Sequence, residues 1–370
     1  MSPPSTTSPP LPTETQQWHL IHKPSALPIL TGPSQTFKLV TTSLPLPLQP
    51  NQLLLKLLYL SNDPAQRGWI SPNANPDRLY LPPVALNTPM HARGLAQVLD
   101  STSPQPGFQK GDFVLASTGW SEYAVVDAQA CQAAPELPKG LTRTHYLGAL
   151  GMTGLTAYYG IKEVGEAKAG DVVVVSGAAG ATGSMVVQIA KKILGVKRVV
   201  GIAGGGEKCR YVEEVLGADR CVDYKKEGWR EELVDATSAA EGGHEKGFVD
   251  VYFDNVGGGM LDFMLTRMAL HGRVVACGAI SEYNSSEGTV LKNYFEVISM
   301  RIQIRGMIVL DYVHKMQEVM GIFQQAIEEG KLKIGEESEH VVEASFEDVP
   351  KVWMTLFEGA NTGKLITKVM

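Results

Sequence analysis

A strand-like apolar run that enters a glycine-rich turn limits the fold of this chain more than any other feature. The run is DVVVV (171–175), and the turn reads SGAAGATGS (176–184). A strand, a tight turn and a helix form the context in which a glycine motif seats a pyrophosphate on helix N–H groups. Because Ala178 stands at the first glycine of the usual G-x-G-x-x-G fingerprint, a strand-to-helix turn without a ligand stays an alternative.

Alternating helical and strand-like segments surround this turn between about residues 150 and 330. Repeated β-α units with short apolar runs predict an α/β protein with a doubly wound parallel sheet. We expect helices at 152–165, 184–194, 207–218 and 260–270, and strands at 172–175, 197–204, 248–258, 272–281 and 301–309.

The rest of the chain has a different texture. Residues 17–145 are proline-rich with short apolar runs such as LLLKLLYL (53–60), DFVLAS (112–117) and SEYAVV (121–126), which predict a β-rich domain. Residues 331–370 return to short strands around one helix near 347–357, and we expect them to rejoin that domain. The domains expected are therefore 17–148 with 331–370, and 149–330. The Pro/Ser/Thr-rich residues 1–16 are expected to be a disordered tail.

Composition excludes several function classes. The chain has 370 residues, a net charge of −6 and no Lys/Arg-rich run, so we expect no nucleic-acid partner. No apolar stretch reaches the roughly 18–20 residues that span a bilayer, so no membrane partner is expected either. Four scattered cysteines without a C-x-x-C pair indicate free thiols in a reducing compartment. The N-terminus lacks the basic and apolar regions of a signal peptide, so a cytoplasmic protein is expected.

The second expected strand bears on the choice of dinucleotide. An NAD site places an acidic residue at the tip of this strand to hold the ribose 2′-OH. Here the strand ends VVGIAGGG (199–206) without an acid, and Lys208 follows Glu207 at a helix start. A glycine turn with a lysine suits a 2′-phosphate better than a hydroxyl, which favours NADPH over NADH. A solvated Lys208 without a ligand is the alternative.

Several motifs together resemble a known family. AAGATGS with GGGEK, YFDNVGG (252–258), CGAISEYN (277–284), NTGK (361–364) and MTGLTAY (152–158) resemble the zinc-independent medium-chain dehydrogenases/reductases over about 17–370. Within them, the similarity is to the branch of prostaglandin/leukotriene reductases and NADP-dependent alkenal double-bond reductases. The resemblance implies a GroES-like catalytic domain, a Rossmann domain and NADPH in the cleft between them. A homodimer is also expected.

The resemblance also implies which residues bind the cofactor. Lys208 and Tyr224 would contact the 2′-phosphate, and Asn361 would reach the nicotinamide half from the other domain. For Asn255 the alternative is an Asx turn that caps a strand, and for Cys277 it is simple packing. The cofactor-binding residues implied are Met152, Thr156, Gly180, Ala181, Thr182, Gly183, Gly204, Lys208, Tyr224, Asn255, Cys277, Gly278, Ala279, Ile280, Ser281, Met307, Ile308, Val309 and Asn361.

No zinc site is expected. Zinc-containing relatives carry Gly-His-Glu and a four-cysteine lobe. At the comparable place this chain reads MHARGLAQV (90–98), in which His91 lacks the following Glu, and the cysteine lobe is missing. A lone histidine is usually structural.

The reaction implied by the resemblance is reduction of the C=C bond of an enone or enal. Hydride goes to the β-carbon, the charge that develops on the carbonyl oxygen is stabilised, and a proton reaches the α-carbon. Tyr283 is the candidate for the stabilising hydrogen bond and for the proton. The alternative is that Tyr283 is an aromatic wall of the pocket without a proton role. Water or a ribose hydroxyl of the cofactor would then supply the proton.

The substrate end departs from the branch. In NDPAQRGW (62–69), Ala65 replaces an aromatic residue, and we expect Trp69 and Tyr80 to replace the lost wall. Arg67 is expected in a buried salt bridge of its domain. Two other functions stay open, a quinone reductase that uses the same hydride and a cofactor-binding protein without turnover.

Overall fold

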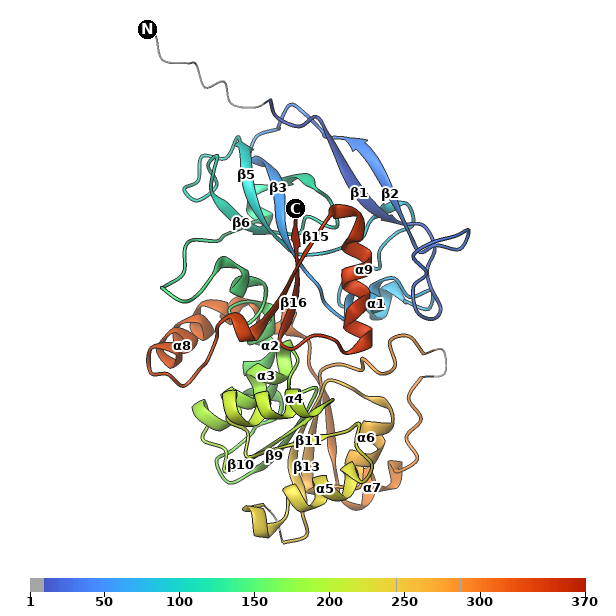
Figure 1. Ribbon diagram of the computed structural model, residues 1–370, viewed down its shortest axis with the longest axis vertical. Coiled ribbons are helices and arrows are strands. Elements are labelled where there is room, and N and C mark those ends of the chain that lie inside the picture. Colours follow the sequence, from blue (N-terminus) through green and yellow to red (C-terminus); the bar gives the residue numbers. More distant parts are fainter. Residues whose placement is uncertain (1–9, 244, 286–287) are drawn as a thin grey trace.

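The apolar runs form three β-sheets in the computed structural model, which describes residues 10–243, 245–285 and 288–370 (Figure 1). One sheet has six strands in the order β11-β10-β9-β12-β13-β14, and every neighbouring pair is parallel. The expected doubly wound sheet is confirmed. Its strands are β9 (Val172–Ser176), β10 (Arg198–Ala203), β11 (Arg220–Asp223), β12 (Val249–Asp254), β13 (Met268–Ala276) and β14 (Gln303–Gly306).

Both faces of this parallel sheet are covered, which explains the unbroken VVVV run of β9. Val173 and Val175 pack into one buried cluster with α2, α3, α4 and α8, whereas Val174 packs into a second cluster with α5, α6 and α7. Successive strand residues point to opposite faces, so a strand buried on both sides is apolar throughout. These helices are α2 (Met152–Tyr159), α3 (Ala181–Gln188), α4 (Gly206–Arg210), α5 (Trp229–Ala236), α6 (Gly258–Leu265), α7 (Tyr294–Ser299) and α8 (Met316–Glu328).

The β-rich part of the chain contains the other two sheets. The three-stranded sheet has the order β2-β1-β4, and the seven-stranded sheet has the order β15-β16-β3-β5-β6-β8, with β7 paired to β3. Its elements are β1 (Glu14–Leu20), β2 (Phe37–Ser43), β3 (Gln52–Ser61), α1 (Gln66–Trp69), β4 (Thr88–Pro89), β5 (Gly94–Ser101), β6 (Phe113–Ala116), β7 (Tyr123–Asp127), β8 (Gln132–Ala133), β15 (Glu339–Ala344), α9 (Val349–Met354) and β16 (Lys364–Val369).

The C-terminal segment returns to the β-rich domain. β16 pairs antiparallel with β3 and parallel with β15, so the red strands of Figure 1 lie among the blue and cyan ones. Trp353 of α9 is fully buried, and its ring packs against Phe37 of β2 and Trp120. β15 and β16 therefore join the β-rich sheet, whereas the division of the chain into 17–148 with 331–370 and 149–330 stays a prediction.

Some expected boundaries are wrong. The helix expected at 260–270 ends at Leu265, and β13 begins at Met268. Leu265 and Met268 are both fully buried, so apolar spacing alone does not separate the end of a helix from the start of a buried strand. The tail expected at 1–16 is too long, because β1 begins at Glu14 and pairs with β2. Residues 1–9 lie outside the described residues.

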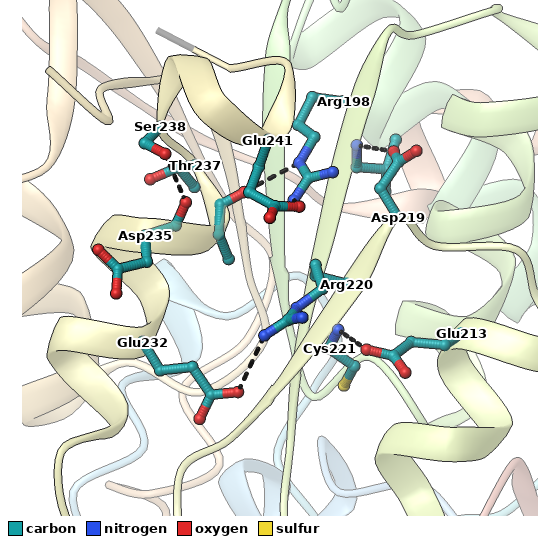
Figure 2. A network of polar contacts seen from close by, with 12 residues as sticks. Arg198, Glu213, Asp219, Arg220, Cys221, Glu232, Asp235, Thr237, Ser238 and Glu241 are labelled. Carbon is teal, nitrogen blue, oxygen red and sulfur yellow. Dashed lines mark hydrogen bonds and ion pairs between the residues drawn. The ribbon is translucent and has the colours of Figure 1, made fainter. Parts of the chain in front are cut away.

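Polar contacts hold the amino ends of β10 and β11 in the parallel sheet (Figure 2). The Arg198 guanidinium donates to the Ala236 carbonyl oxygen at 2.9 Å and pairs with Glu241 at 3.2 Å. Asp219 accepts from the Val199 backbone N–H at 2.7 Å, and Glu213 accepts from that of Cys221. These bonds lie at the amino ends of the strands. The glycine loop lies at the opposite, carboxyl ends, where open α/β sheets bind their ligands.

Gly183 provides a test of the glycine loop. A Cβ at residue 183 would lie 2.2 Å from the Gly177 carbonyl oxygen, whereas a Cβ at Gly170 would meet nothing within 4 Å. We expect Gly183→Ala to lower the free energy of unfolding by about 1–3 kcal/mol, because α3 must shift from the loop. Gly170→Ala is the control and should change it by less than about 0.5 kcal/mol. Equal denaturation midpoints for the two variants would contradict the close packing described here.

Candidate functional site

A cleft with a volume of about 1200 Å³ runs across the carboxyl ends of the parallel strands, between the parallel sheet and the β-rich domain. The strand order reverses between β9 and β12, and open α/β sheets bind ligands at such a switch point. All the cofactor-binding residues expected from the sequence border this cleft except Ala279. Ala65, Trp69 and Tyr80, the expected substrate residues, border it as well.

The glycine loop forms one wall of the cleft and fits a pyrophosphate. Gly180 is the N-cap of α3 and makes no side-chain cap bond, so the first-turn N–H groups are available to an anion. Gly177 has φ +59°, a conformation that favours glycine, and it makes the tight turn one residue before Ala178. Ala178 is fully buried beneath the loop and donates its N–H to the Ile202 carbonyl oxygen at 3.0 Å. Its Cβ therefore does not obstruct the seat.

The tip of β10 has the chemistry of a phosphate site. Gly204, Lys208, Tyr224 and Lys225 all border the cleft here. The Lys208 ammonium donates to the carbonyl oxygens of Gly359 and Asn361 at 2.8 and 2.7 Å, which leaves one of its three protons free. Burial, and then the charge of Lys225, lowers the pKa of Lys208.

The carboxylate at the end of β11 is committed to the backbone. Asp223, at the end of β11, is buried and accepts from the N–H groups of Gly205 and Lys225 at 2.8 and 3.1 Å. It shapes the glycine turn that follows β10 and does not border the cleft. Among the described residues, β10 ends without an acid where an NAD site would need one, and Glu358, which borders the cleft at this end, comes from the segment after α9.

The end of β12 combines a structural and a cleft-facing role. The Asx turn that was the alternative for Asn255 is made by Asp254, whose Oδ1 accepts from the N–H groups of Val256 and Gly257 at 2.9 and 3.0 Å. Asn255 donates its side-chain Nδ2 proton to the Ser176 carbonyl oxygen at 2.7 Å and borders the cleft. Asn255 thus ties β12 to β9 at the switch point.

Tyr283 lies at the cleft on the segment after β13. Its hydroxyl oxygen accepts from the Ala279 backbone N–H at 3.2 Å, so the hydroxyl proton stays available to a ligand. Burial raises the pKa of Tyr283, so the hydroxyl is protonated at neutral pH. Ala279, which does not border the cleft, holds the Tyr283 hydroxyl through its backbone N–H. Burial also raises the pKa of the neighbouring Cys277 thiol to about 12.

The substrate end contains two linked aromatic residues. The Trp69 indole N–H donates to the Tyr80 hydroxyl oxygen at 3.0 Å, and both side chains border the cleft beside Ala65. The salt bridge expected for Arg67 is wrong for the part of the chain that the structure describes. Its buried guanidinium instead donates to the carbonyl oxygens of Pro24 and Ala26 and to Asn284 Oδ1, each at 2.9 Å. Arg67 therefore links its domain to the segment that contains Tyr283.

Several charged residues of the cleft were missed by the sequence analysis. Asp63 and Lys364 form a partly buried ion pair in the cleft wall, and Arg93 and Lys225 border it too. Lys225 directly follows Tyr224, which gave a local signal, whereas Asp63 and Lys364 are 301 residues apart and meet only because β16 pairs with β3. His91 borders the cleft, and among the described residues no three His, Cys, Asp or Glu side chains gather where they could hold a metal ion.

Comparison with known proteins agrees with this architecture. Residues 16–134 match the family model described as the N-terminal domain of oxidoreductase, and residues 181–325 match the one described as zinc-binding dehydrogenase. The NADP(+)-dependent 2-alkenal reductase of Nicotiana tabacum is 37% identical over 332 residues, which cover 90% of this chain and 91% of the relative. The NADPH-dependent curcumin reductase of Escherichia coli is 33% identical over 367 residues and covers 96% of each chain.

The chain belongs to the medium-chain dehydrogenases/reductases, in the branch of the prostaglandin and alkenal reductases. It is an oxidoreductase. Among solved structures, CurA of Vibrio vulnificus in complex with NADPH superimposes with a TM-score of 0.82 at 32% identity, covering 96% of this chain and 99% of CurA. A quinone oxidoreductase of Pseudomonas syringae has a TM-score of 0.70 at 19% identity, covers 96% of this chain and 99% of its own, and shows the fold alone.

A further relative, from Saccharomyces cerevisiae, is described as an uncharacterized membrane protein and is 35% identical over 347 residues, covering 91% of this chain and 92% of its own. None of the helices in the described ranges 10–243, 245–285 and 288–370 combines the length and the apolar character that crossing a membrane requires.

Proposed function

We propose that this chain is an NADPH-dependent reductase that reduces the C=C bond of α,β-unsaturated aldehydes and ketones. The observation that carries the proposal is the Tyr283 hydroxyl, which is protonated, oriented by the Ala279 N–H and exposed to the cleft near the switch point. The names of the tobacco and E. coli relatives support the same chemistry.

The cofactor proposed is NADPH. The first turn of α3 would hold the pyrophosphate, and Lys208, Tyr224 and Lys225 would surround the 2′-phosphate. A phosphate there would relieve the repulsion between the two lysines and accept a hydrogen bond from the remaining N–H of the Lys208 ammonium. When bound, NADPH supplies the hydride for the substrate β-carbon.

Tyr283 would stabilise the charge that develops on the substrate oxygen. An enolate oxygen is a far better acceptor than the ground-state carbonyl, so a hydroxyl fixed beforehand favours the transition state. The Ala279 N–H bond orients this hydroxyl and compensates negative charge on it if its proton is transferred. Cys277 would stay a neutral thiol, because a pKa of about 12 leaves almost no thiolate to attack an electrophilic substrate.

Measurements of NADPH oxidation distinguish the proposed function from the two others that the sequence left open. A quinone reductase would oxidise NADPH with quinones and not with enones, and a cofactor-binding protein would oxidise it with neither. The proposal requires NADPH oxidation that depends on an added enone or enal, with the saturated carbonyl compound as the product. NADPH oxidation by quinones alone would favour the second function.

We also propose a homodimer that forms through β14. This strand is the edge of the parallel sheet, and Ile304 on it is 42% exposed. Phe295 of α7, close in sequence, is 70% exposed. A second copy that paired its own β14 antiparallel would continue the sheet across a two-fold axis and cover this edge. The expected cytoplasmic location stays a prediction from the sequence.

Lys208 sets the cofactor preference in this proposal. We expect Lys208→Ala to lower kcat/KM for NADPH about 10- to 100-fold while that for NADH changes little, because charge-assisted bonds to the 2′-phosphate are lost. Lys226→Ala removes an exposed charge nearby that does not border the cleft, and it should leave the preference unchanged. An unchanged NADPH/NADH ratio in Lys208→Ala would remove the proposed role.

Tyr283→Phe tests the chemistry. We expect kcat with an enone to fall about 10- to 1000-fold, because the hydrogen bond to the developing oxyanion is lost, while the Kd for NADPH stays the same. Tyr294→Phe removes a hydroxyl from an exposed tyrosine and serves as the control. An unchanged kcat in Tyr283→Phe would show that Tyr283 only lines the pocket and has no role in the chemistry.

The dimer is tested by charge at the sheet edge. Sedimentation of the wild-type protein should give a dimer, and Ile304→Lys should give a monomer because two like charges would face each other across the two-fold axis. Leu86→Lys changes a residue that is 50% exposed in the β-rich domain and should sediment as the wild type does. A dimeric Ile304→Lys variant would place the interface elsewhere.

A further inference from the structure

Two of the four cysteines lie together beneath the proposed phosphate site. Cys209 is on α4 and Cys221 is on the neighbouring strand β11, and both are buried free thiols in one apolar cluster. Lys208 directly precedes Cys209, and Tyr224 follows β11, and both of these residues border the cleft. A change at the two sulfur atoms would therefore act on the elements that carry the phosphate site.

Gly201 of β10 locates the Cys221 sulfur. Gly201 and Cys221 are partners in the parallel ladder, and a Cβ at residue 201 would lie 3.3 Å from Cys221 Sγ and 2.7 Å from Val212 Cγ1. The sulfur therefore faces the helix that continues α4 over Tyr211–Val215. Cys209 precedes Val212 by one helical turn, and both are buried on the same face of this helix. The missing Cβ of Gly201 leaves the space in which the helix approaches the sulfur.

Hydrogen bonds hold α4 and its continuation against β11 on both sides of the pair. The Cys209 N–H donates to the Gly205 carbonyl oxygen at 3.1 Å, and the Gly205 N–H donates to Asp223 Oδ1 at 2.8 Å. Asp223 shares a face of β11 with Cys221, because alternate strand residues point the same way. One turn after Cys209, Glu213 accepts from the Cys221 N–H at 2.7 Å (Figure 2). The helix face that bears Cys209 is thus bonded to Cys221 itself.

The two thiols contact each other. The Cys221 thiol donates a hydrogen bond to the Cys209 sulfur, which lowers the pKa of Cys209 and raises that of Cys221. The pair thus contains a sulfur with more thiolate character, suited to attack, and a protonated thiol beside it that can complete a disulfide. Among the described residues, no third His, Cys, Asp or Glu completes a metal site with them. Oxidation therefore suits this pair better than metal binding does.

We propose that Cys209 and Cys221 form a reversible disulfide that weakens the binding of the NADP cofactor. The oxidant is a hydroperoxide. The Cys209 thiolate attacks its O–O bond, becomes a sulfenic acid and releases an alcohol, or water where the oxidant is hydrogen peroxide. The Cys221 sulfur then attacks the Cys209 sulfur and releases water, so the two thiols together lose two electrons and two protons to the peroxide. A dithiol reductant reverses the reaction.

The disulfide acts on the phosphate site because its bond is short. It joins the sulfur atoms at about 2.0 Å, much closer than two unbonded thiols, so α4 moves toward β11. Lys208 moves with Cys209, away from the position in which it bonds the carbonyl oxygens of Gly359 and Asn361. The inference rests on the proposed place of the 2′-phosphate beside Lys208 and not on the substrate. NADP+ should therefore bind less tightly, whereas NAD+, which lacks this phosphate, should be affected little.

The test treats the reduced full-length protein with hydrogen peroxide and identifies linked peptides by mass spectrometry. Peptides joined through Cys209 and Cys221 should appear within hours and disappear with dithiothreitol. The Kd for NADP+ should rise about 10-fold in the oxidised protein, and that for NAD+ by less than about threefold. Cys209→Ser should abolish both the link and the rise. Cys131→Ser, which removes a half-buried thiol outside the cleft, should behave as the wild type does.

Thermodynamic linkage gives a second measurement on the wild-type protein. Saturating NADP+ should shift the dithiol–disulfide equilibrium in a glutathione buffer toward the dithiol by the same factor of about 10. Absence of the linked peptides in the wild type would overturn the inference, whether or not Cys209→Ser folds. A disulfide that leaves the Kd for NADP+ unchanged, or that weakens NAD+ equally, would also overturn it. The cofactor preference of Lys208→Ala decides the phosphate site separately.

Discussion

The antiparallel pairing of β16 with β3 is the constraint on which the cleft depends. It brings Lys364 to Asp63 and places residues 359–363 beside the glycine loop. There the Gly363 N–H donates to the Ala179 carbonyl oxygen at 2.8 Å, so the two domains are joined by a backbone bond at the proposed pyrophosphate seat. A Cβ at residue 363 would lie 2.2 Å from the Ser338 carbonyl oxygen, so the close packing of residue 363 on the turn before β15 requires glycine.

Burial in the cleft wall keeps two side chains protonated. Burial raises the pKa of both Tyr283 and Cys277, and Cys277 lies close enough to Tyr283 to add to the rise in the pKa of the Tyr283 hydroxyl. For the proposed reduction of electrophilic enones, both effects are useful. A neutral tyrosine can donate a proton, and a neutral thiol resists alkylation.

Local patterns predicted the parallel sheet and the glycine loop, because strand runs, turns and helices are written in consecutive residues. The proposed phosphate lysine was found in the same way, since Lys208 follows β10 closely. The pairing of Asp63 with Lys364 was missed because no spacing rule connects residues so far apart. The salt bridge expected for Arg67 was wrong for a related reason. The sequence indicates that a buried arginine needs partners, but backbone carbonyl oxygens satisfy it as well as a carboxylate does.

The position of β16 inside its sheet also has a consequence for synthesis of the protein. β3 is complete by residue 61 and pairs with β7 over residues 52–56, yet the strand that pairs with its last residues, 59–61, is β16 at 366–368. During translation the parallel-sheet domain can therefore fold while the last residues of β3 still lack their partner strand. These residues expose unpaired backbone groups for as long as some 300 residues take to emerge, about 15–60 s at 5–20 residues per second.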